Sequence, residues 1–256
     1  MDSIYSLVSA MKGQQRQMDS VSNNLANVNT TGFKSDEVLF REYYTQFMGQ
    51  DLESEEEMFA HEEFISPFHR GGTSFVKPDH VAPSMEQGSF KHTQNPLDLA
   101  IQSEGFFVVD TPAGIRYTRN GQFLKDGEGF LITNSGHRVQ GKKGPLKIDG
   151  KEFAVGQDGS AIVDGKEIDF LKIVNFQEPD RLTKMGNSYW VPASDRQKPI
   201  DIERPVIHQG VLEGSNVEAV QEMVKMIAVN RSYEASQKAM KSLDGLDEKS
   251  ISIARV

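Results

Sequence analysis

Apolar residues recur every seven positions along the first 28 residues. Two columns, offset by three residues, hold Ile4, Met11, Met18, Leu25 and Leu7, Gln14, Val21, Val28. Gln14 is the one polar break, and the positions between the columns are mostly polar. A narrow apolar stripe of this kind predicts a helix over residues 3 to 28 that pairs with another helix as a coiled coil. A surface helix packed on a globular core is the alternative.

The C-terminal segment predicts a second long helix. Ser215 stands three residues before Glu218, the spacing of a capping box at a helix start. Apolar residues then cover most of the circumference of the first turns: Val217, Val220, Met223, Val224, Met226, Ile227 and Val229. This surplus predicts contacts with other subunits, unless the middle of the chain covers the extra face. Gly245 is expected to weaken or stop the helix.

The segment from about residue 88 to 176 alternates short apolar runs with turn dipeptides. The dipeptides, whose residues favour the positive φ angles of tight hairpins, are Asn120-Gly121, Asp126-Gly127, Asp149-Gly150, Asp158-Gly159 and Asp164-Gly165. No segment of helical period separates the runs, which argues against a doubly wound α/β sheet. The sequence therefore predicts an antiparallel β domain, built as a barrel or a sandwich.

These patterns together predict an α+β protein, in which long N- and C-terminal helices form a coiled coil and the middle of the chain forms a central antiparallel β-rich domain. The segment DLESEEEMFAHEE, residues 51–63, holds seven acids and reads as a solvated insertion in a connector. We divide the chain into an N-terminal helical segment at 1–32, the connector at 33–80, the β-rich domain at 81–209 and a C-terminal helical segment at 210–256.

Composition excludes several classes of function. The formal net charge of -9 argues against binding to nucleic acid or to an anionic membrane, which requires a basic face. The absence of cysteine excludes disulfides and thiolate chemistry. No apolar run approaches the roughly 18 residues of a membrane span, and the first residues do not have the pattern of a cleaved signal peptide.

No catalytic constellation emerges from the motifs. The HEEF stretch at His61 lacks the second histidine of a zinc H-E-x-x-H motif, because Ile65 stands there. Asp98 is either a buried acid or, more simply, an outward-facing residue of a strand. Tyr117 and Arg119 belong to an expected hairpin arm that could recognise a partner. We expect no enzyme activity, cofactor, metal or small-molecule substrate, and favour an assembly protein over a β-domain binding module with coiled-coil ends.

Six motifs then follow one another along the chain: SNNLANVNTTGFKS, TQNPLDLAIQSEGFFVV, YTRNGQF, GFLITNSGHRVQG, GVLEGSNV and EMVKMIAVNRSYEASQKAM. The first resembles the N-terminal signature of the bacterial flagellar axial proteins, the rod and hook group, and the last resembles their C-terminal helix. Within that group the sequence most resembles rod proteins of about this length, the proximal rod protein first and the distal rod protein second. Gln94 and Ser103 stand where the family usually has glycine.

The resemblance implies a structural subunit of the flagellar basal-body rod, the drive shaft that transmits motor torque to the hook. Family members pair their terminal helices as a coiled coil in the inner layer of a tube and place the β domain outside. The implied partners are copies of the chain, other rod and hook proteins and the flagellar export apparatus. The implied location is the basal body, across the periplasm, after type III export without a cleaved signal peptide.

We predict that subunit contacts use residues from both terminal segments. The N-terminal set is Ile4, Leu7, Met11, Met18, Val21, Asn24, Leu25, Asn27 and Val28, and the C-terminal set is Val220, Val224, Ile227 and Tyr233. Four asparagines, Asn23, Asn24, Asn27 and Asn29, are also expected to end the first helix, because asparagine side chains compete with the helical backbone, and Gly32 is expected to let the chain turn.

Overall fold

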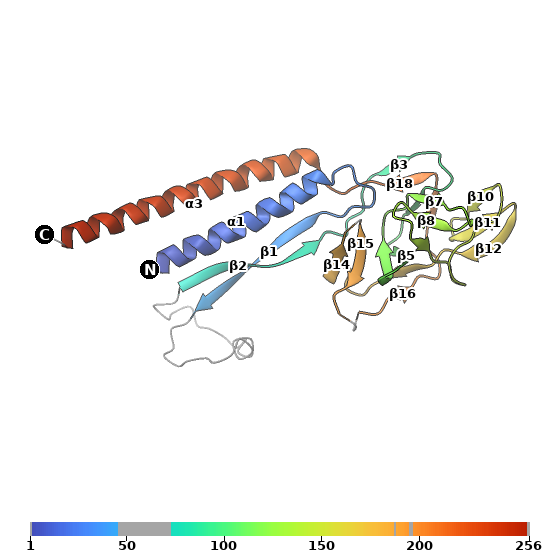
Figure 1. Ribbon diagram of the computed structural model, residues 1–256, viewed down its shortest axis with the longest axis horizontal. Helices are drawn as coiled ribbons and strands as arrows, with labels where there is room; N and C mark the ends of the chain where they lie inside the picture. Colours follow the sequence, from blue (N-terminus) through green and yellow to red (C-terminus); the bar gives the residue numbers. More distant parts are fainter. Residues whose placement is uncertain (1, 46–72, 187, 195–196, 255–256) are drawn as a thin grey trace. The chain divides into compact units, whose positions relative to one another are not determined.

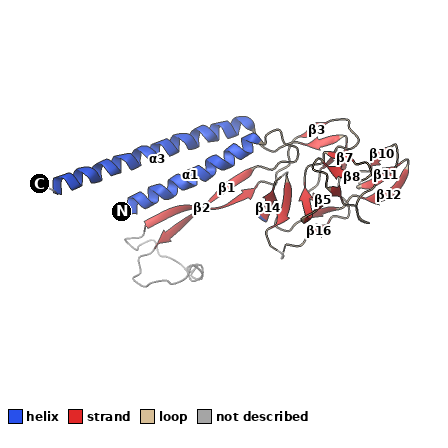
Figure 2. Ribbon diagram, in the orientation of Figure 1, coloured by secondary structure: helices blue, strands red, loops and turns tan. Residues whose placement is uncertain are grey.

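The computed structural model describes residues 2–45, 73–186, 188–194 and 197–254, with backbone alone at 2–5, 41–45, 73–80, 244 and 246–254. The chain forms two compact units. The first unit contains Met1–Ser20, Val38–Val81 and Lys225–Val256, and the second contains Val21–Glu37 and Ala82–Val224. In the described residues the long helices occupy the two ends of the sequence, and strands and loops lie between them (Figures 1 and 2).

Two long helices are confirmed, with boundaries that differ from those predicted. Helix α1 spans Asp2–Ala26, and helix α3 spans Ala219–Ala254. The predicted capping box is wrong, because the Ser215 hydroxyl accepts a hydrogen bond from the Val217 amide at 3.2 Å and α3 begins only at Ala219. Helix α3 also continues through Gly245. One glycine costs a helix only about 1 kcal/mol relative to alanine, which is too little to end it.

The predicted coiled coil is wrong: no extended coiled coil is evident in the described residues. In the first unit α1 and α3 are bridged at the polar break, where Gln14 Nε2 donates to Ser232 Oγ at 2.7 Å and to Ser236 Oγ at 3.3 Å. Val220, predicted as a subunit contact, is 70% exposed, whereas Val229 is 6% exposed. Nine residues separate the two valines, about half a turn around a helix. The side of α3 that carries Val229 is therefore buried within the chain, and the side that carries Val220 is not.

A two-stranded sheet occupies part of the predicted connector. It consists of β1 (Asp36–Thr45) and β2 (Thr73–Pro83). In the first unit Phe40 of β1 lies against α1, since a Cβ atom added to Gly13 would be 3.1 Å from the Phe40 ring. The acidic insertion at 51–63, with His61, lies outside the described residues. The division into four segments stays a prediction.

The other strands, all in the second unit, form four sheets. The largest contains, in spatial order, β14 (Leu182–Met185), β15 (Tyr189–Pro192), β6 (Gly114–Thr118), β5 (Phe106–Thr111), β9 (Arg138–Val139), β8 (Leu131–Thr133) and β7 (Phe123–Lys125), with β13 (Ile173–Asn175) and β16 (Ile200–Asp201) attached beside β5. A second sheet joins β10 (Phe153–Val155), β11 (Ser160–Val163) and β12 (Lys166–Phe170). Two pairs complete the set, β17 (Ile207–Gln209) with β4 (Leu99–Ile101) and β18 (Val211–Glu213) with β3 (Phe90–His92). A short 3-10 helix, Pro179–Arg181, precedes β14.

Every strand pairing in this β body is antiparallel, which confirms the α+β class and the antiparallel domain. Asp164 and Gly165, at φ 48° and 78°, join β11 to β12 in a tight hairpin, as predicted. Asn120-Gly121 is not a hairpin turn, because β6 pairs with β5 and β15 whereas β7 pairs with β8. Gly121 instead allows a close approach: a Cβ atom there would lie 1.6 Å from the Leu99 carbonyl oxygen.

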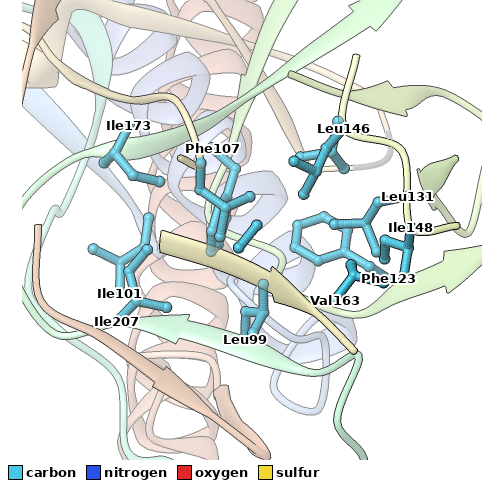
Figure 3. Close-up of a cluster of buried hydrophobic side chains, with 13 residues drawn as sticks. Leu99, Ile101, Phe107, Phe123, Leu131, Leu146, Ile148, Val163, Ile173 and Ile207 are labelled. Carbon is cyan, nitrogen blue, oxygen red and sulfur yellow. The ribbon is translucent and has the colours of Figure 1, made fainter. Parts of the chain in front are cut away.

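The core of the β body consists of two apolar clusters. Leu99, Phe107, Phe123 and Leu131 are among the side chains that point toward one another in the larger cluster (Figure 3). The smaller cluster surrounds Trp190. Neighbouring residues Phe106 and Phe107 of β5 enter different clusters, because successive side chains of a strand point to opposite faces. β5 therefore lies between the two halves of the core.

A pair of identical substitutions on adjacent strands tests this core. Leu131 of β8 is fully buried, whereas Leu124 of β7 is 47% exposed. We expect Leu131→Ala to lower the free energy of unfolding by about 2–5 kcal/mol, from lost burial and the cavity left behind. The control Leu124→Ala should change it by about 0.5 kcal/mol or less. Urea unfolding followed by Trp190 fluorescence measures both, and equal losses would contradict the assigned core.

Candidate functional site

The two segments that connect the terminal helices to the β body meet in the second unit. We call residues 23–36 and 213–222 together the junction. The Gly32 amide donates to the Glu213 carbonyl at 2.8 Å, and the Ser35 amide donates to Asn216 Oδ1 at 2.7 Å. Gly32 adopts φ +67°, which confirms the predicted turn. The segments that follow α1 and precede α3 are thus bound directly to each other.

A buried ionic cluster lies at the centre of the junction. Lys34 Nζ donates to Glu213 Oε1 at 2.7 Å and to the Glu86 carbonyl at 2.6 Å. Arg119 NH1 approaches the other oxygen, Glu213 Oε2, at 3.5 Å, and donates to the Ser103 carbonyl at 3.0 Å. The side chains of Lys34 and Glu213 are each 1% exposed. The Glu213 carboxylate therefore pairs with two cationic side chains, Lys34 and Arg119, that lie far apart in the sequence.

Burial governs the electrostatics of this cluster. It lowers the pKa of Lys34 below 10.5, an effect that the neighbouring Glu213 carboxylate partly offsets. Burial likewise lowers the pKa of Arg119, again against the attraction of Glu213. Removing one partner of a buried pair is far more costly than breaking a surface pair, because the remaining charge stays buried and unpaired. Glu213 is the residue on which the cluster depends.

Asn24 connects the end of α1 to the start of β1. Its Oδ1 accepts from the Asp36 amide at 2.8 Å, and its Nδ2 donates to the Asp36 carbonyl at 3.0 Å. The same Nδ2 lies 3.3 Å from Glu222 Oε2 of α3. The Asn24 side chain thus satisfies both backbone groups of Asp36, as a neighbouring β-strand would. These bonds fix the path of the chain between the end of α1 and the start of β1.

Lys184, on strand β14 of the β body, binds the segment between α1 and β1. Its Nζ donates to the Lys34 carbonyl at 2.5 Å and pairs with Asp36 Oδ1 at 2.7 Å. The ammonium group also lies over the rings of Phe33 and Trp190, 4.1 and 5.4 Å from their centroids. Burial lowers the pKa of Lys184, and Asp36 partly offsets that shift.

The predicted interface residues have different environments. Val21 and Asn24 are buried, Val220, Val224 and Ile227 are exposed, and the half-buried members are Leu7, Met11, Met18, Leu25, Asn27, Val28 and Tyr233. Ile4 lies in α1, but its side chain is outside the described part. Asn27 bonds locally, with Nδ2 donating to the Asn23 carbonyl and Oδ1 accepting from Thr30. Their role in subunit contacts stays a prediction.

Three interpretations of polar residues are corrected. Asp98 does not face outward: it is 4% exposed, and its Oδ1 accepts from Asn95 Nδ2 at 3.0 Å. Tyr117 and Arg119 are buried rather than displayed on a hairpin arm. Sequence reasoning missed the Lys34–Glu213–Arg119 cluster and Lys184. The one signal in the sequence was that Lys34 and Glu213 are the only charged residues of the motifs SNNLANVNTTGFKS and GVLEGSNV.

Neither helix, over its described residues, is long and apolar enough to cross a membrane. Three family models match the chain: "flagella basal body rod protein" at residues 4–34, "flagellar hook protein FlgE/F/G D1 domain" at 100–164, and "flagellar basal body rod FlgEFG protein C-terminal" at 208–253. The flagellar basal-body rod protein FlgG of Bacillus subtilis is 32% identical, over 99% of each chain. The chain belongs to the flagellar basal-body rod protein family.

Relatives in this rod protein family carry two names. FlgF of Mesorhizobium japonicum is 30% identical, over 98% of this chain and 96% of the relative. FlgF of Caulobacter vibrioides is 31% identical, over 93% and 92%. The matched N-terminal region ends at residue 34 and the matched C-terminal region begins at 208, so the ionic partners Lys34 and Glu213 lie within the two terminal family regions.

We expect Glu213→Gln to lower the free energy of unfolding by about 3–5 kcal/mol, because Lys34 and Arg119 would keep buried charges without a carboxylate. Glu128→Gln is the matched control, since Glu128 pairs with Arg138 at the same 2.7 Å but is 71% exposed. That substitution should cost about 1 kcal/mol or less. Denaturant unfolding of both variants measures the difference, and a small effect at Glu213 would contradict a central role for its carboxylate.

The lowered pKa of Lys34 predicts a pH dependence. Between this pKa and the ordinary value of 10.5, the unfolded chain binds more protons at Lys34 than the folded chain does. The free energy of unfolding should therefore rise with pH across this window. Lys34→Met removes that contribution, so its unfolding free energy should rise less than that of the native chain. Urea titrations from about pH 8 upward test this, and parallel curves would contradict it.

Proposed function

We propose that this chain is a structural subunit of the flagellar basal-body rod, which assembles with copies of itself and with other axial proteins and transmits motor torque to the hook. Similarity to rod proteins over nearly the whole chain carries the proposal. Relatives named FlgF and relatives named FlgG both match, so the similarity supports the role common to both. The chain acts by assembly and not as an enzyme.

An outward apolar face at the start of α3 supports a role in assembly. Val220, Met223, Val224 and Ile227 are spaced as one face of a helix and are 70%, 46%, 61% and 53% exposed. The same face continues with Arg231, Glu234 and Lys238, which are polar and exposed. Among the described side chains of this face, the exposed large apolar residues lie between Val220 and Ile227. We name Val220, Met223, Val224 and Ile227 the α3 outer face, and assign it to a neighbouring subunit.

The α1 stripe supplies the second set of contacts in this proposal. Leu7, Met11 and Met18 are only half-buried in a single chain. Further burial by neighbours would add roughly 25 cal/mol per Å² of apolar surface, shared among many subunits. Torque then passes between helices and β body through the junction, where buried charges and Asn24 fix both connecting segments.

The proposed location is the rod of the basal body, across the periplasm. Its proposed partners are rod and hook proteins and the flagellar export apparatus, which would export the chain by the type III route without a cleaved signal peptide. No nucleic acid and no small-molecule substrate enter this function. The proposal fits a chain of net charge -9, because self-assembly through apolar surfaces needs no basic face.

A charge on the α3 outer face should prevent assembly. Ile227→Asp would bury an unpaired carboxylate in the contact, and we expect loss of co-sedimentation with rod partners and loss of swimming in a strain that relies on the variant. Ala228→Asp adds the same charge at the next exposed position, about 100° around the helix, and should retain both. Circular dichroism should show both variants folded. Normal swimming with Ile227→Asp would contradict the proposed interface.

A further inference from the structure

The less exposed side of α3 in the first unit repeats every seven residues. From residue 226 to 243, its buried and half-buried side chains alternate in steps of three and four: Met226, Val229, Tyr233, Ser236, Met240 and Leu243. On α1, half-buried side chains of the same unit have the same spacing at Leu7, Met11, Gln14 and Met18. A slide of one helix along the other by seven residues would replace one apolar side chain by another at most of these positions. The apolar residues alone therefore do not select one alignment of the two helices.

One polar contact between the helices distinguishes these alignments. Gln14 Nε2 donates to Ser236 Oγ at 3.3 Å and to Ser232 Oγ at 2.7 Å. The Ser236 hydroxyl donates to the Ser232 carbonyl at 3.0 Å, so its oxygen acts as the acceptor for Gln14. Val229 and Leu243 stand seven residues before and after Ser236. A slide of seven residues in either direction would therefore place the Gln14 amide against an apolar side chain.

A second polar contact between the helices has the same spacing. In the second unit, Asn24 Nδ2 of α1 donates to Glu222 Oε2 of α3 at 3.3 Å. Ten residues separate Gln14 from Asn24, and ten residues separate Glu222 from Ser232. One alignment of the two sequences, read in opposite directions, thus satisfies both contacts. The polar residues of the helices agree on an alignment that their apolar residues leave open.

We propose that Gln14 is a register lock, a polar residue that holds α1 and α3 in one alignment and excludes alignments slid by seven residues. Burial of an amide without a hydrogen-bond partner is unfavourable, whereas apolar side chains lose little when they exchange apolar neighbours. A single polar residue in an apolar helix contact accordingly selects one register at a cost in stability. Gln14 carries such a cost, because its Oε1 is buried and has no donor among the described residues. One consequence, that load passes between the helices without sliding, rests on the proposed function; the lock itself does not.

The alternative is that Gln14 only adds stability to the helix contact. The two roles predict opposite effects of Gln14→Met, which keeps the unbranched shape of the side chain and removes its amide. If the amide only stabilises, the helices of this variant should melt at a lower temperature. If it is a lock, they should melt at the same or a higher temperature in more than one alignment, since the unpaired Oε1 disappears. The serine hydroxyls lose little, because Ser232 is exposed and Ser236 keeps its bond to the Ser232 carbonyl.

Spin-label distances measure the alignment in the full-length chain. The sequence has no cysteine, so Arg16→Cys and Lys241→Cys, at exposed positions of α1 and α3 in the first unit, supply the only two labelling sites. We expect one narrow distance distribution in the labelled native chain, with slid alignments populated about ten-fold less or lower. Gln14→Met should add distances displaced by up to roughly 10 Å, the rise of seven helical residues. The matched control Gln15→Met, at the neighbouring exposed position, should give the native distribution.

A double variant of the acceptors, Ser232→Ala with Ser236→Ala, separates the amide from its partners. It leaves Gln14 without its two hydrogen bonds, so the helices should melt at a lower temperature, measured by far-UV circular dichroism. Adding Gln14→Met to the double variant should restore the melting temperature but not the single alignment. Independent contributions from the three residues would not give this non-additive result.

Three results would overturn the register lock: several distances in the labelled native chain, one unshifted distance with Gln14→Met, or a lower melting temperature for Gln14→Met than for Gln15→Met. The distances are measured at concentrations at which the chain is monomeric, so they do not depend on rod assembly. Co-sedimentation of the native chain with rod partners tests the proposed function separately.

Discussion

The buried carboxylate of Glu213 is the constraint on which the rest of the arrangement depends. Glu213 is the last residue of β18, a strand of the β body, and lies six residues before the start of α3. Through Lys34 it holds the segment that follows α1, and through Arg119 it holds the chain between β6 and β7. A lone charge in that position would be strongly unfavourable. The segment after α1 supplies the Lys34 ammonium group, and the segment before α3 supplies the Glu213 carboxylate. Each charge needs the other as its buried partner, so the native positions of the two segments depend on each other.

The seven-residue repeat in α1 led to a wrong prediction of a coiled coil because the sequence of the partner helix, α3, does not specify one pairing face. The α1 pattern correctly indicates an amphipathic helix. The start of α3 is apolar around most of its circumference, so its sequence does not specify which side turns inward. Val229 and Glu222 lie on the buried side, and Val220 and Val224 on the exposed side. The described polar contact between the helices joins Gln14, the polar position of the α1 repeat, to Ser232 and Ser236, which are not among the apolar residues predicted on α3.

Local signals succeeded at some positions and failed at others, such as the capping box at Ser215 and the turn at Asn120-Gly121. Asp164-Gly165 made its hairpin because both residues tolerate positive φ, and the alternating runs formed antiparallel strands. The candidate site is not local. Lys34 meets Glu213 across 179 positions, and the Lys34 carbonyl meets Lys184 across 150. Arg119 and Asp98 resembled surface residues because polar side chains usually are exposed. The side chain of Asp98 bonds Asn95, only three residues away, but buried Arg119 meets Glu213 across 94 positions. No periodicity encodes such pairs.

The junction also relates stability to assembly. A subunit that carries load between its helices and its β body needs connecting segments that do not yield, and buried ionic and amide contacts provide directional restraints that apolar contacts lack. The same segments must leave surfaces free for neighbours. Lys34, Glu213 and Asn24 point inward, whereas Val220 and Val224 point outward from the adjoining turn of α3. A polar interior and an apolar exterior reverse the usual arrangement of a globular protein. In the proposed assembly, neighbouring subunits cover these apolar side chains, which relates the geometry of the junction to the contacts between subunits.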